Sequence, residues 1–415
     1  MSQAGETEAQ GLLRQAAAAR SAGRPAEALA LAQAAVAADP ASAPGWNMVG
    51  LLQLARGDAA GARASLSTAL RFDPDAPGLW LNHARACSAA GDFPGELASL
   101  DQALSRDQFL LPALLDKGKV LARLGREDEA ALLLQALLAG IGDERAFPPP
   151  IQAALAEARE LVRRHGERRH NVYSAALQEV AAAFPGADLE RARRFGEQRA
   201  GQRKVYMQQP TAGHFPYLPA LEFFPPETIP WLDEIEAATD AIRAELLSLW
   251  AEDVPGFRPY VAYAPDQPVN QWAELNHSPA WSAYFLWEDG VRNDSHCARC
   301  PETAALLERL PLFDLPGKAP TAMFSILQPR TRIPAHTGST NVRTTVHLPL
   351  VVPEGCGFRV GSETRLWVEG KAWAFDDTIE HEAWNDSDRP RAILIVDAWN
   401  PLLSEAERAA VRRIG

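Results

Sequence analysis

Small, apolar and turn-forming residues recur every 34 residues over about the first 140 positions of the chain. The repeated columns are Gly23, Gly57, Gly91 and Gly125; Ala16, Gly50, Ala84 and Gly118; Ala28, Ala62 and Ala130, interrupted by Glu96; Trp46 and Trp80; and Pro40 and Pro74. Each unit fits two helices, because small residues allow close packing, glycine suits the turn between helices, and Asp-Pro ends the second helix. One pair cannot bury its own apolar face, so the pattern predicts about four pairs stacked into a superhelix over residues 1–141.

The next segment, residues 142–213, stays helical in pattern but loses the 34-residue period. Residues 152–165 and 175–183 are amphipathic, and Pro148-Pro149-Pro150 marks a break before them. We expect separate helices here that cap the array and join it to the rest of the chain.

Residues 214–415 change to short β-type runs between two helical segments. One helix is expected from Ile229 to Trp250, with Pro230 and acidic residues near its start, and another from Ser404 to Arg413, capped by Ser404. The β-type runs, separated by turn residues, are 322–327, 343–352, 357–360, 364–368, 372–375 and 391–397. Short strands at near-even spacing predict an antiparallel sandwich or barrel, and therefore a multidomain α + β protein.

Composition and charge narrow the classes of function. The chain has 415 residues and a net charge of −12, without a long basic run, which argues against nucleic acid or an anionic membrane as the main partner. Residues 1–6 do not resemble a signal peptide, and no apolar run approaches the roughly 20 residues of a membrane helix. Four cysteines do not form a disulfide framework, so we expect a cytoplasmic protein. Cys297 and Cys300 form an isolated CxxC, for which a metal or redox role is the less favoured interpretation.

Two histidines and one arginine in the β-region are candidates for metal and anion binding. His336 follows Pro-Ala and precedes Thr-Gly, so it is expected at a strand end or loop, while His381 lies in an acidic loop between two β-type runs. A lone strand histidine is more often structural than a ligand, but Arg391 begins the next strand, where its guanidinium could bind a carboxylate. Two histidines with a carboxylate are the usual ligand set of non-haem iron(II) oxygenases.

The N-terminal period and its Trp, Gly, Ala and Pro columns resemble the tetratricopeptide repeat. This resemblance implies a concave groove that holds a peptide or a partner helix. The alternative is that the array is only a stalk or a dimerisation device.

Several motifs of the β-region together resemble the aspartyl/asparaginyl β-hydroxylases, and members of that family often carry tetratricopeptide repeats as well. The matching segments are Phe324-Ser325-Ile326, His336-Thr337-Gly338-Ser339-Thr340-Asn341, 375–384 and 395–401. The resemblance extends weakly back to about His214. It implies a double-stranded β-helix, also called a jelly roll or cupin-like fold, in an oxygenase domain that spans residues 214–415.

The resemblance also implies a role for each matching residue. His336 and His381 would be the two protein ligands of Fe(II), and Asp377 would hydrogen-bond metal-bound water. Arg391, helped by Ser325, would anchor the distal carboxylate of the cosubstrate 2-oxoglutarate, with His347 and Trp281 in the same pocket. O2 would take the remaining metal position, and oxidative decarboxylation to succinate would drive hydroxylation of the substrate.

Two positions depart from the familiar patterns. The metal-binding carboxylate of related oxygenases is expected two residues after the first histidine, where this chain has Gly338; the β-hydroxylases share this departure, and water would fill the place. Thr345 stands where animal members have a second arginine. Arg343, two residues earlier on a regular strand, would point to the same face and is a candidate replacement.

The favoured hypothesis is a 2-oxoglutarate-dependent hydroxylase of an Asp or Asn side chain in a peptide or protein, held partly by the repeat groove. The main alternative is a repeat-based interaction protein with an inactive oxygenase-like domain. A hydroxylase of a lipid or small molecule is a third hypothesis, less favoured because no membrane-binding element is recognised in the sequence.

Overall fold

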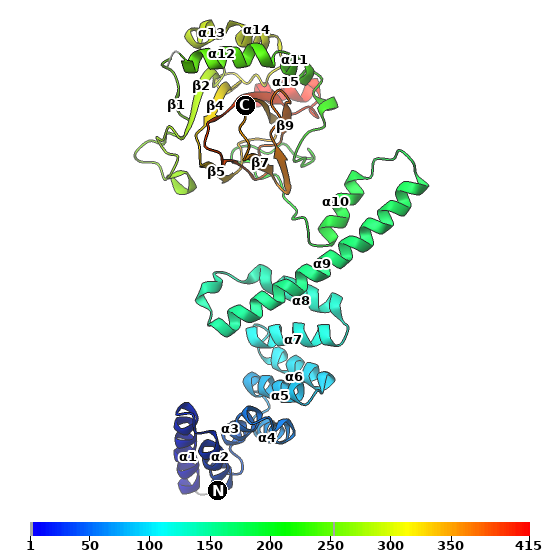
Figure 1. Cartoon of the computed structure of the whole chain (residues 1–415), viewed down its shortest axis with the longest axis vertical. Coiled ribbons are helices and arrows are strands. Elements are labelled where there is room, and N and C mark those ends of the chain that lie inside the picture. Colours follow the sequence, from blue (N-terminus) through cyan, green and yellow to red (C-terminus); the bar gives the residue numbers. More distant parts are fainter. Residues whose placement is uncertain (1–2, 252–253) are drawn as a thin grey trace. The chain divides into compact units, whose positions relative to one another are not determined.

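The computed structural model describes residues 3–251 and 254–415, in two compact units, Met1–Gln202 and Arg203–Gly415 (Figure 1). Met1 and Ser2, which belong to the segment not expected to be a signal peptide, lie outside the described residues. Within the described residues, no helix is both long and apolar enough to cross a membrane.

The first unit begins with antiparallel helix pairs that follow the 34-residue period (Figure 1). Its helices are α1 (Gln3–Ser21), α2 (Pro25–Ala38), α3 (Ala43–Ala55), α4 (Ala59–Phe72), α5 (Pro77–Ala89), α6 (Phe93–Arg106), α7 (Leu111–Arg123) and α8 (Glu127–Gly140), followed by η1 (Glu144–Ala146), α9 (Pro149–Ala183) and α10 (Glu190–Arg199). The predicted tetratricopeptide-like array is confirmed.

The repeated small residues have two separate physical roles. At Gly50 an added Cβ atom would lie 2.6 Å from the Leu66 side chain, and at Gly118 it would lie 2.5 Å from Leu134, so glycine allows the two helices of each pair to touch. At the turns, Gly57 has a φ of 81° and Gly91 one of 74°, in the left-handed region that glycine adopts without strain.

The prediction of separate helices at 152–165 and 175–183 is wrong, because both lie in the single 35-residue helix α9. Its polar residues support one another instead of interrupting it: Arg163 forms ion pairs with Glu160 at 2.7 Å and Glu167 at 2.5 Å, at helical i,i+3 and i,i+4 spacing. Glycine is needed at position 166 of this helix because an added Cβ atom would lie only 2.5 Å from the Ala200 carbonyl oxygen.

The second unit contains two antiparallel sheets. Among the described residues, the main sheet has the order β1-β2-β4-β11-β6-β9, with β3 paired to β2, and the minor sheet has the order β5-β10-β7-β8. The strands are β1 (Arg258–Pro259), β2 (Trp281–Glu288), β3 (Val291–Arg292), β4 (Ala322–Leu327), β5 (Thr331–His336), β6 (Arg343–Val351), β7 (Cys356–Val360), β8 (Glu363–Leu366), β9 (Trp373–Phe375), β10 (His381–Asn385) and β11 (Arg391–Trp399). From β4 onward the chain passes repeatedly between the two sheets, as the predicted sandwich requires; the finer expectation of a double-stranded β-helix stays a prediction.

The two sheets pack face to face, and helices cover the other face of the main sheet. One apolar cluster joins Leu327 and Ile393 of the main sheet to Ile333 and Phe358 of the minor sheet. A second cluster packs the opposite side of the main sheet against helices; the covering elements are α11 (Leu232–Ala237), α12 (Thr239–Ala251), α13 (Asp294–Arg299) and α14 (Pro301–Arg309), and the short η2 (Pro226–Thr228) precedes them in the chain (Figure 1). Along the chain, η3 (Asn270–Trp272) precedes β2, and α15 (Glu405–Ile414) follows β11. α15 is capped by Ser404 as expected.

The expected helix from Ile229 to Trp250 is interrupted. It is divided into α11 and α12 around Ala238, where the Thr239 hydroxyl donates a hydrogen bond to the Glu236 carbonyl oxygen at 2.6 Å. A hydroxyl that bonds locally to the backbone competes with regular helical bonding, which accounts for the break.

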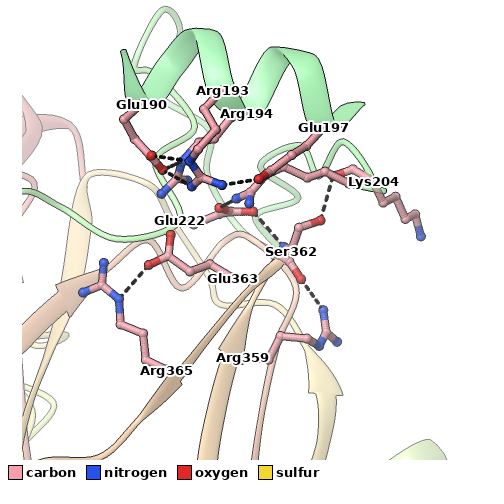
Figure 2. Close-up of polar contacts among 12 residues, drawn as sticks. Glu190, Arg193, Arg194, Glu197, Lys204, Glu222, Arg359, Ser362, Glu363 and Arg365 are labelled. Atoms are coloured by element: carbon pink, nitrogen blue, oxygen red, sulfur yellow. Dashed lines mark hydrogen bonds and ion pairs between the residues drawn. The ribbon is translucent and has the colours of Figure 1, made fainter. Parts of the chain in front are cut away.

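The second unit begins at Arg203, before the expected domain start at His214, because residues 203–213 bond to its strands and loops. Ser362 donates its backbone N–H to Glu222 at 2.7 Å and its hydroxyl to the Lys204 carbonyl oxygen at 2.8 Å (Figure 2). The Thr211 N–H donates to the Gly338 carbonyl oxygen at 3.0 Å. This segment therefore packs on the sheet domain instead of forming part of a separate linker over residues 142–213.

Candidate active site

A cavity of about 550 Å³ lies between the two sheets of the second unit. Alternate residues of neighbouring strands line it, as expected for side chains on one face of a sheet. The contributing side chains include Ser325 and Met323 of β4, Arg343, Thr345 and His347 of β6, Arg391, Ile393, Ile395 and Asp397 of β11, and His336 and His381 of the minor sheet. The candidate residues expected from the sequence are thus brought together in one cavity.

The two histidines are direct neighbours across the β5–β10 ladder. His381 is the Cα partner of His336, and their ring centroids are 4.1 Å apart. Each ring is held by the backbone two residues earlier: Nδ1 lies 2.8 Å from the Pro334 carbonyl oxygen in His336, and 3.0 Å from the Ile379 carbonyl oxygen in His381. A carbonyl can only accept, so Nδ1 carries the proton and Nε2 keeps its lone pair, as a metal ligand requires.

Burial keeps both imidazoles neutral. It lowers the pKa of His336 below its ordinary value, and it places the pKa of His381 well below that value, with the neighbouring His336 as a second cause. The part of the chain that the structure describes contains no cluster of three or more His, Cys, Asp or Glu side chains suited to a metal ion.

β5 and β10, which present these histidines, were not predicted. His336, expected at a strand end or loop, is the last residue of β5, whereas His381, expected in an acidic loop, is the first residue of β10. Both strands are short and carry polar residues at intervals, so their alternation is too weak to identify them. The pairing of β5 with β10 joins two separate segments of the chain, so it cannot be recognised from either segment alone.

Gly338 and Asp377 occupy adjoining space beside the histidines. A Cβ atom at Gly338 would lie 2.2 Å from Asp377 Oδ2, and the Gly338 N–H donates to the Asp377 carbonyl oxygen at 2.6 Å. Asp377 Oδ1 is buried and has no hydrogen-bond partner among the described residues. The carboxylate of Asp377 thus lies where a side chain at position 338 would otherwise begin.

Arg343 lies between two buried carboxylates. Its guanidinium donates to Asp377 Oδ2 and forms an ion pair with Asp397 at 3.2 Å. Arg343, Thr345 and His347 all line the cavity, so the expectation that Arg343 and Thr345 share a face is confirmed. The charge of Arg343 is nevertheless matched within the protein.

Arg391 is the opposite case. Its side chain is 1% exposed, and neither Nε nor Nη1 has a hydrogen-bond partner within the described part of the chain. Burial lowers its pKa to about 10, and its guanidinium carbon lies 5.2 Å from the centroid of the Trp367 ring. An unmatched buried guanidinium that faces a cavity is a strong candidate for binding a carboxylate ligand.

The other expected pocket residues surround Arg391. Trp281 Nε1 donates to Ser325 Oγ at 3.0 Å, which leaves the Ser325 hydroxyl hydrogen available for another acceptor. His347 Nδ1 has no partner among the described residues, and burial, followed by the charge of Arg391, places the pKa of His347 well below its ordinary value.

Some cavity residues were missed by sequence reasoning. Trp367 stacks near His347, Trp272 has its ring edge-on to His336 at 4.9 Å, and Asp397 pairs with Arg343. Asp397 belongs to one of the resembling segments, which is the only sequence signal that pointed to it. Trp272 and Trp367 carry no such signal, because aromatic residues of this spacing are equally typical of an apolar core.

Comparison with known proteins identifies the family. A family profile described as Aspartyl/Asparaginyl beta-hydroxylase matches residues 236–401. The chain is 30% identical over 271 residues to aspartate beta-hydroxylase domain-containing protein 2 of Xenopus tropicalis, covering 63% of this chain and 70% of that protein. The chain belongs to the aspartyl/asparaginyl β-hydroxylase family.

Other relatives of this family share shorter segments. The chain is 43% identical over 142 residues to the human aspartyl/asparaginyl beta-hydroxylase, which is 34% of this chain and 18% of that protein. It is 37% identical over 185 residues to the ornithine lipid ester-linked acyl 2-hydroxylase of Rhizobium tropici, which is 43% of this chain and 60% of that protein. The chain therefore spans less than two thirds of each of these two relatives, both of which are named hydroxylases; an enzyme is supported.

Proposed function

We propose that this β-hydroxylase-family protein is an Fe(II)- and 2-oxoglutarate-dependent dioxygenase that hydroxylates an Asp or Asn side chain of a peptide or protein. The observation that carries the proposal is that the guanidinium of Arg391, unmatched among the described residues, shares a cavity with two neutral histidines whose Nδ1 atoms carry the proton, so that each Nε2 keeps its lone pair. The guanidinium of Arg391 is suited to bind an anion, and the two histidines are suited to bind a metal ion. 2-Oxoglutarate bound to Fe(II) would satisfy both.

The residues fit this cofactor set. His336 and His381 would hold Fe(II) through Nε2, and Arg391 with the Ser325 hydroxyl would bind the distal carboxylate of 2-oxoglutarate. When bound, the iron, 2-oxoglutarate and O2 together supply the oxidising chemistry that replaces a C–H bond by C–OH.

The protein's own contribution is positioning. The backbone carbonyls of Pro334 and Ile379 fix the tautomer and direction of the two imidazoles, and Arg343 fixes the carboxylate of Asp377. Oδ1 of Asp377, which has no partner among the described residues, is available to accept a hydrogen bond from water near the histidines. The Trp281, Trp272 and Phe375 rings line the cavity beside these polar groups, and their apolar faces lower the local polarity, which strengthens the polar contacts.

The repeat array is proposed to bind the peptide or protein substrate. Stacked helix pairs form extended concave surfaces, and this chain joins such an array to a sheet domain that contains the whole candidate site. The array would then contribute affinity without contributing to the chemistry.

The direct test is succinate formation by the purified protein with Fe(II), 2-oxoglutarate and O2. Succinate that requires both Fe(II) and His381 supports the proposal. No succinate under conditions that retain the fold would favour the alternative of an inactive oxygenase-like interaction protein.

The name of the Rhizobium relative specifies an acyl chain, and the cavity has apolar walls, so an acyl hydroxylase is the second candidate. Mass spectrometry of a peptide library and an acylated lipid, treated side by side, separates the two by which one gains oxygen.

A further inference from the structure

The charged groups of the cavity indicate which substrate group it can accept. Among the described residues, two arginines and no lysine line the cavity, together with Asp377 and Asp397. The proposed function assigns Arg391 to the distal carboxylate of 2-oxoglutarate. Among these cavity residues, Arg343 is therefore the remaining cationic side chain that could meet a substrate carboxylate.

Arg343 is already matched by carboxylates of the protein. It pairs with both Asp377 and Asp397, and each of these acids is about 5% exposed or less. Asp397 is fixed in place by a hydrogen bond from the Thr321 backbone N–H at 3.1 Å. The Nε of Arg343 has no partner within the described residues, but the three side chains together carry no surplus positive charge.

The wall between Arg391 and the group formed by Arg343, Asp377 and Asp397 is uncharged. It is formed by Met323 of β4, Thr345 of β6 and Ile395 of β11, which share the cavity-facing side of the main sheet. Met323 is the Cα partner of Ile395, and Thr345 is the Cα partner of Asp397, two residues further along β11. Met323 is 2% exposed and Thr345 is 8% exposed.

We propose that the cavity selects an uncharged substrate side chain, with a carboxamide as the best fit, and discriminates against a carboxylate. A buried carboxylate without a counter-ion is disfavoured, and here it would also face Asp377 and Asp397. A carboxamide has no net charge, so it avoids both penalties, and its N–H groups can donate to carboxylate oxygens such as those of Asp377. The inference rests on the proposed function because it assigns Arg391 to 2-oxoglutarate.

The test compares two probes that differ only in charge, N-acetyl-asparagine N-methylamide and N-acetyl-aspartate N-methylamide. Each is titrated into the full chain loaded with Zn(II) and 2-oxoglutarate, and binding is followed by saturation-transfer NMR. We expect the asparagine probe to bind at least about tenfold more tightly. Equal binding, tighter binding of the aspartate probe, or no binding of either at tens of millimolar overturns the inference.

A matched pair of variants tests the physical cause. Met323→Lys adds a cation to the uncharged wall with little change in side-chain length, and Met323→Gln adds polarity without charge. The lysine variant should shift the preference toward the aspartate probe by at least about tenfold, while the glutamine variant keeps the original preference. An unchanged preference in a folded lysine variant overturns the charge argument, and if that variant does not fold, the wild-type comparison decides.

Succinate formation without any probe is measured in parallel and separates the two levels of proposal. No succinate with a retained preference for the asparagine probe would remove the proposed chemistry but leave the charge selectivity. Succinate formation with a preference for the aspartate probe would leave the proposed chemistry and remove the charge selectivity.

Discussion

A Cβ atom at Gly338 would lie 2.2 Å from Oδ2 of Asp377, so glycine at this position makes room for the aspartate carboxylate. The same position is where related oxygenases are expected to have a metal-binding acid. In this chain the neighbouring acid reaches the cavity from a different segment, and Arg343 holds it there. A side chain at 338 and the present position of Asp377 therefore exclude each other.

Gly338→Ala should displace Asp377 and lower 2-oxoglutarate turnover by about 10- to 100-fold, the usual effect of disturbing a residue that orients a metal site. Gly213→Ala is the matched control, because its added Cβ would meet Thr340 Oγ1 only at an ordinary 3.8 Å. Rates of succinate formation check the prediction, and equal rates for both variants would show that Asp377 does not need this space.

His381→Ala should lower the affinity for a divalent metal by more than about 100-fold, because it removes one of two proposed ligands. The metal affinity is measured by calorimetric titration, and circular dichroism checks the fold. The control is His214→Ala, which changes an exposed histidine of the same unit. Normal turnover by His381→Ala would refute the site, and spectra that reveal a protein carboxylate on the metal would refute the two-histidine version.

Arg391→Met should have opposite effects on stability and function. The apparent requirement for 2-oxoglutarate should rise well over tenfold, because loss of a buried charge partner typically costs about 2–5 kcal/mol. The ligand-free variant should unfold at higher temperature, since the wild type buries a guanidinium that is unmatched among the described residues, at a cost of about 1–3 kcal/mol. An unchanged 2-oxoglutarate requirement would indicate that another cation, such as Arg343, binds the cosubstrate.

The metal-free protein should lose stability as pH falls below the ordinary histidine pKa of 6.5. The fold lowers the pKa of His381, so the unfolded chain binds more protons in this range, and stability is present above 6.5 and declines below it. Melting temperatures between about pH 7.5 and pH 5 measure the slope. His381→Gln should reduce the slope without abolishing it, because burial also lowers the pKa values of His336 and His347. An unchanged slope would assign the effect to other groups.

Removal of residues 1–202 should leave succinate formation without substrate largely intact, because all proposed iron and cosubstrate residues lie in the second unit. Turnover of a long peptide or protein substrate should fall through weaker binding, whereas a short peptide should be little affected. Equal changes for long and short substrates would instead favour the stalk or dimerisation role of the array. A shorter truncation, of residues 1–141, should give the same result.

The sequence by itself determined the features that depend on local chemistry or on a strict period. Glycines and small residues 34 positions apart were sufficient for the helix pairs, because a turn with positive φ and a close helix contact each tolerate few residue types. The runs of β4, β6 and β11 were recognised because both of their faces are largely buried and apolar. The candidate residues came from motif resemblance more than from pattern.

Only the tertiary structure decided how those residues meet. The ladder partner of His381 is His336, 45 positions earlier, and it is set by the pairing of two short strands that have no clear alternation of their own. The matching of Arg343 and the isolation of Arg391 were equally invisible in the sequence, since both are cavity-facing arginines on strands of the same sheet. Their difference arises because folding brings Asp377 and Asp397 beside Arg343 and brings no carboxylate among the described residues to Nε or Nη1 of Arg391. Charge matching depends on distances between segments far apart in the chain, and those distances exist only once the two sheets have packed together.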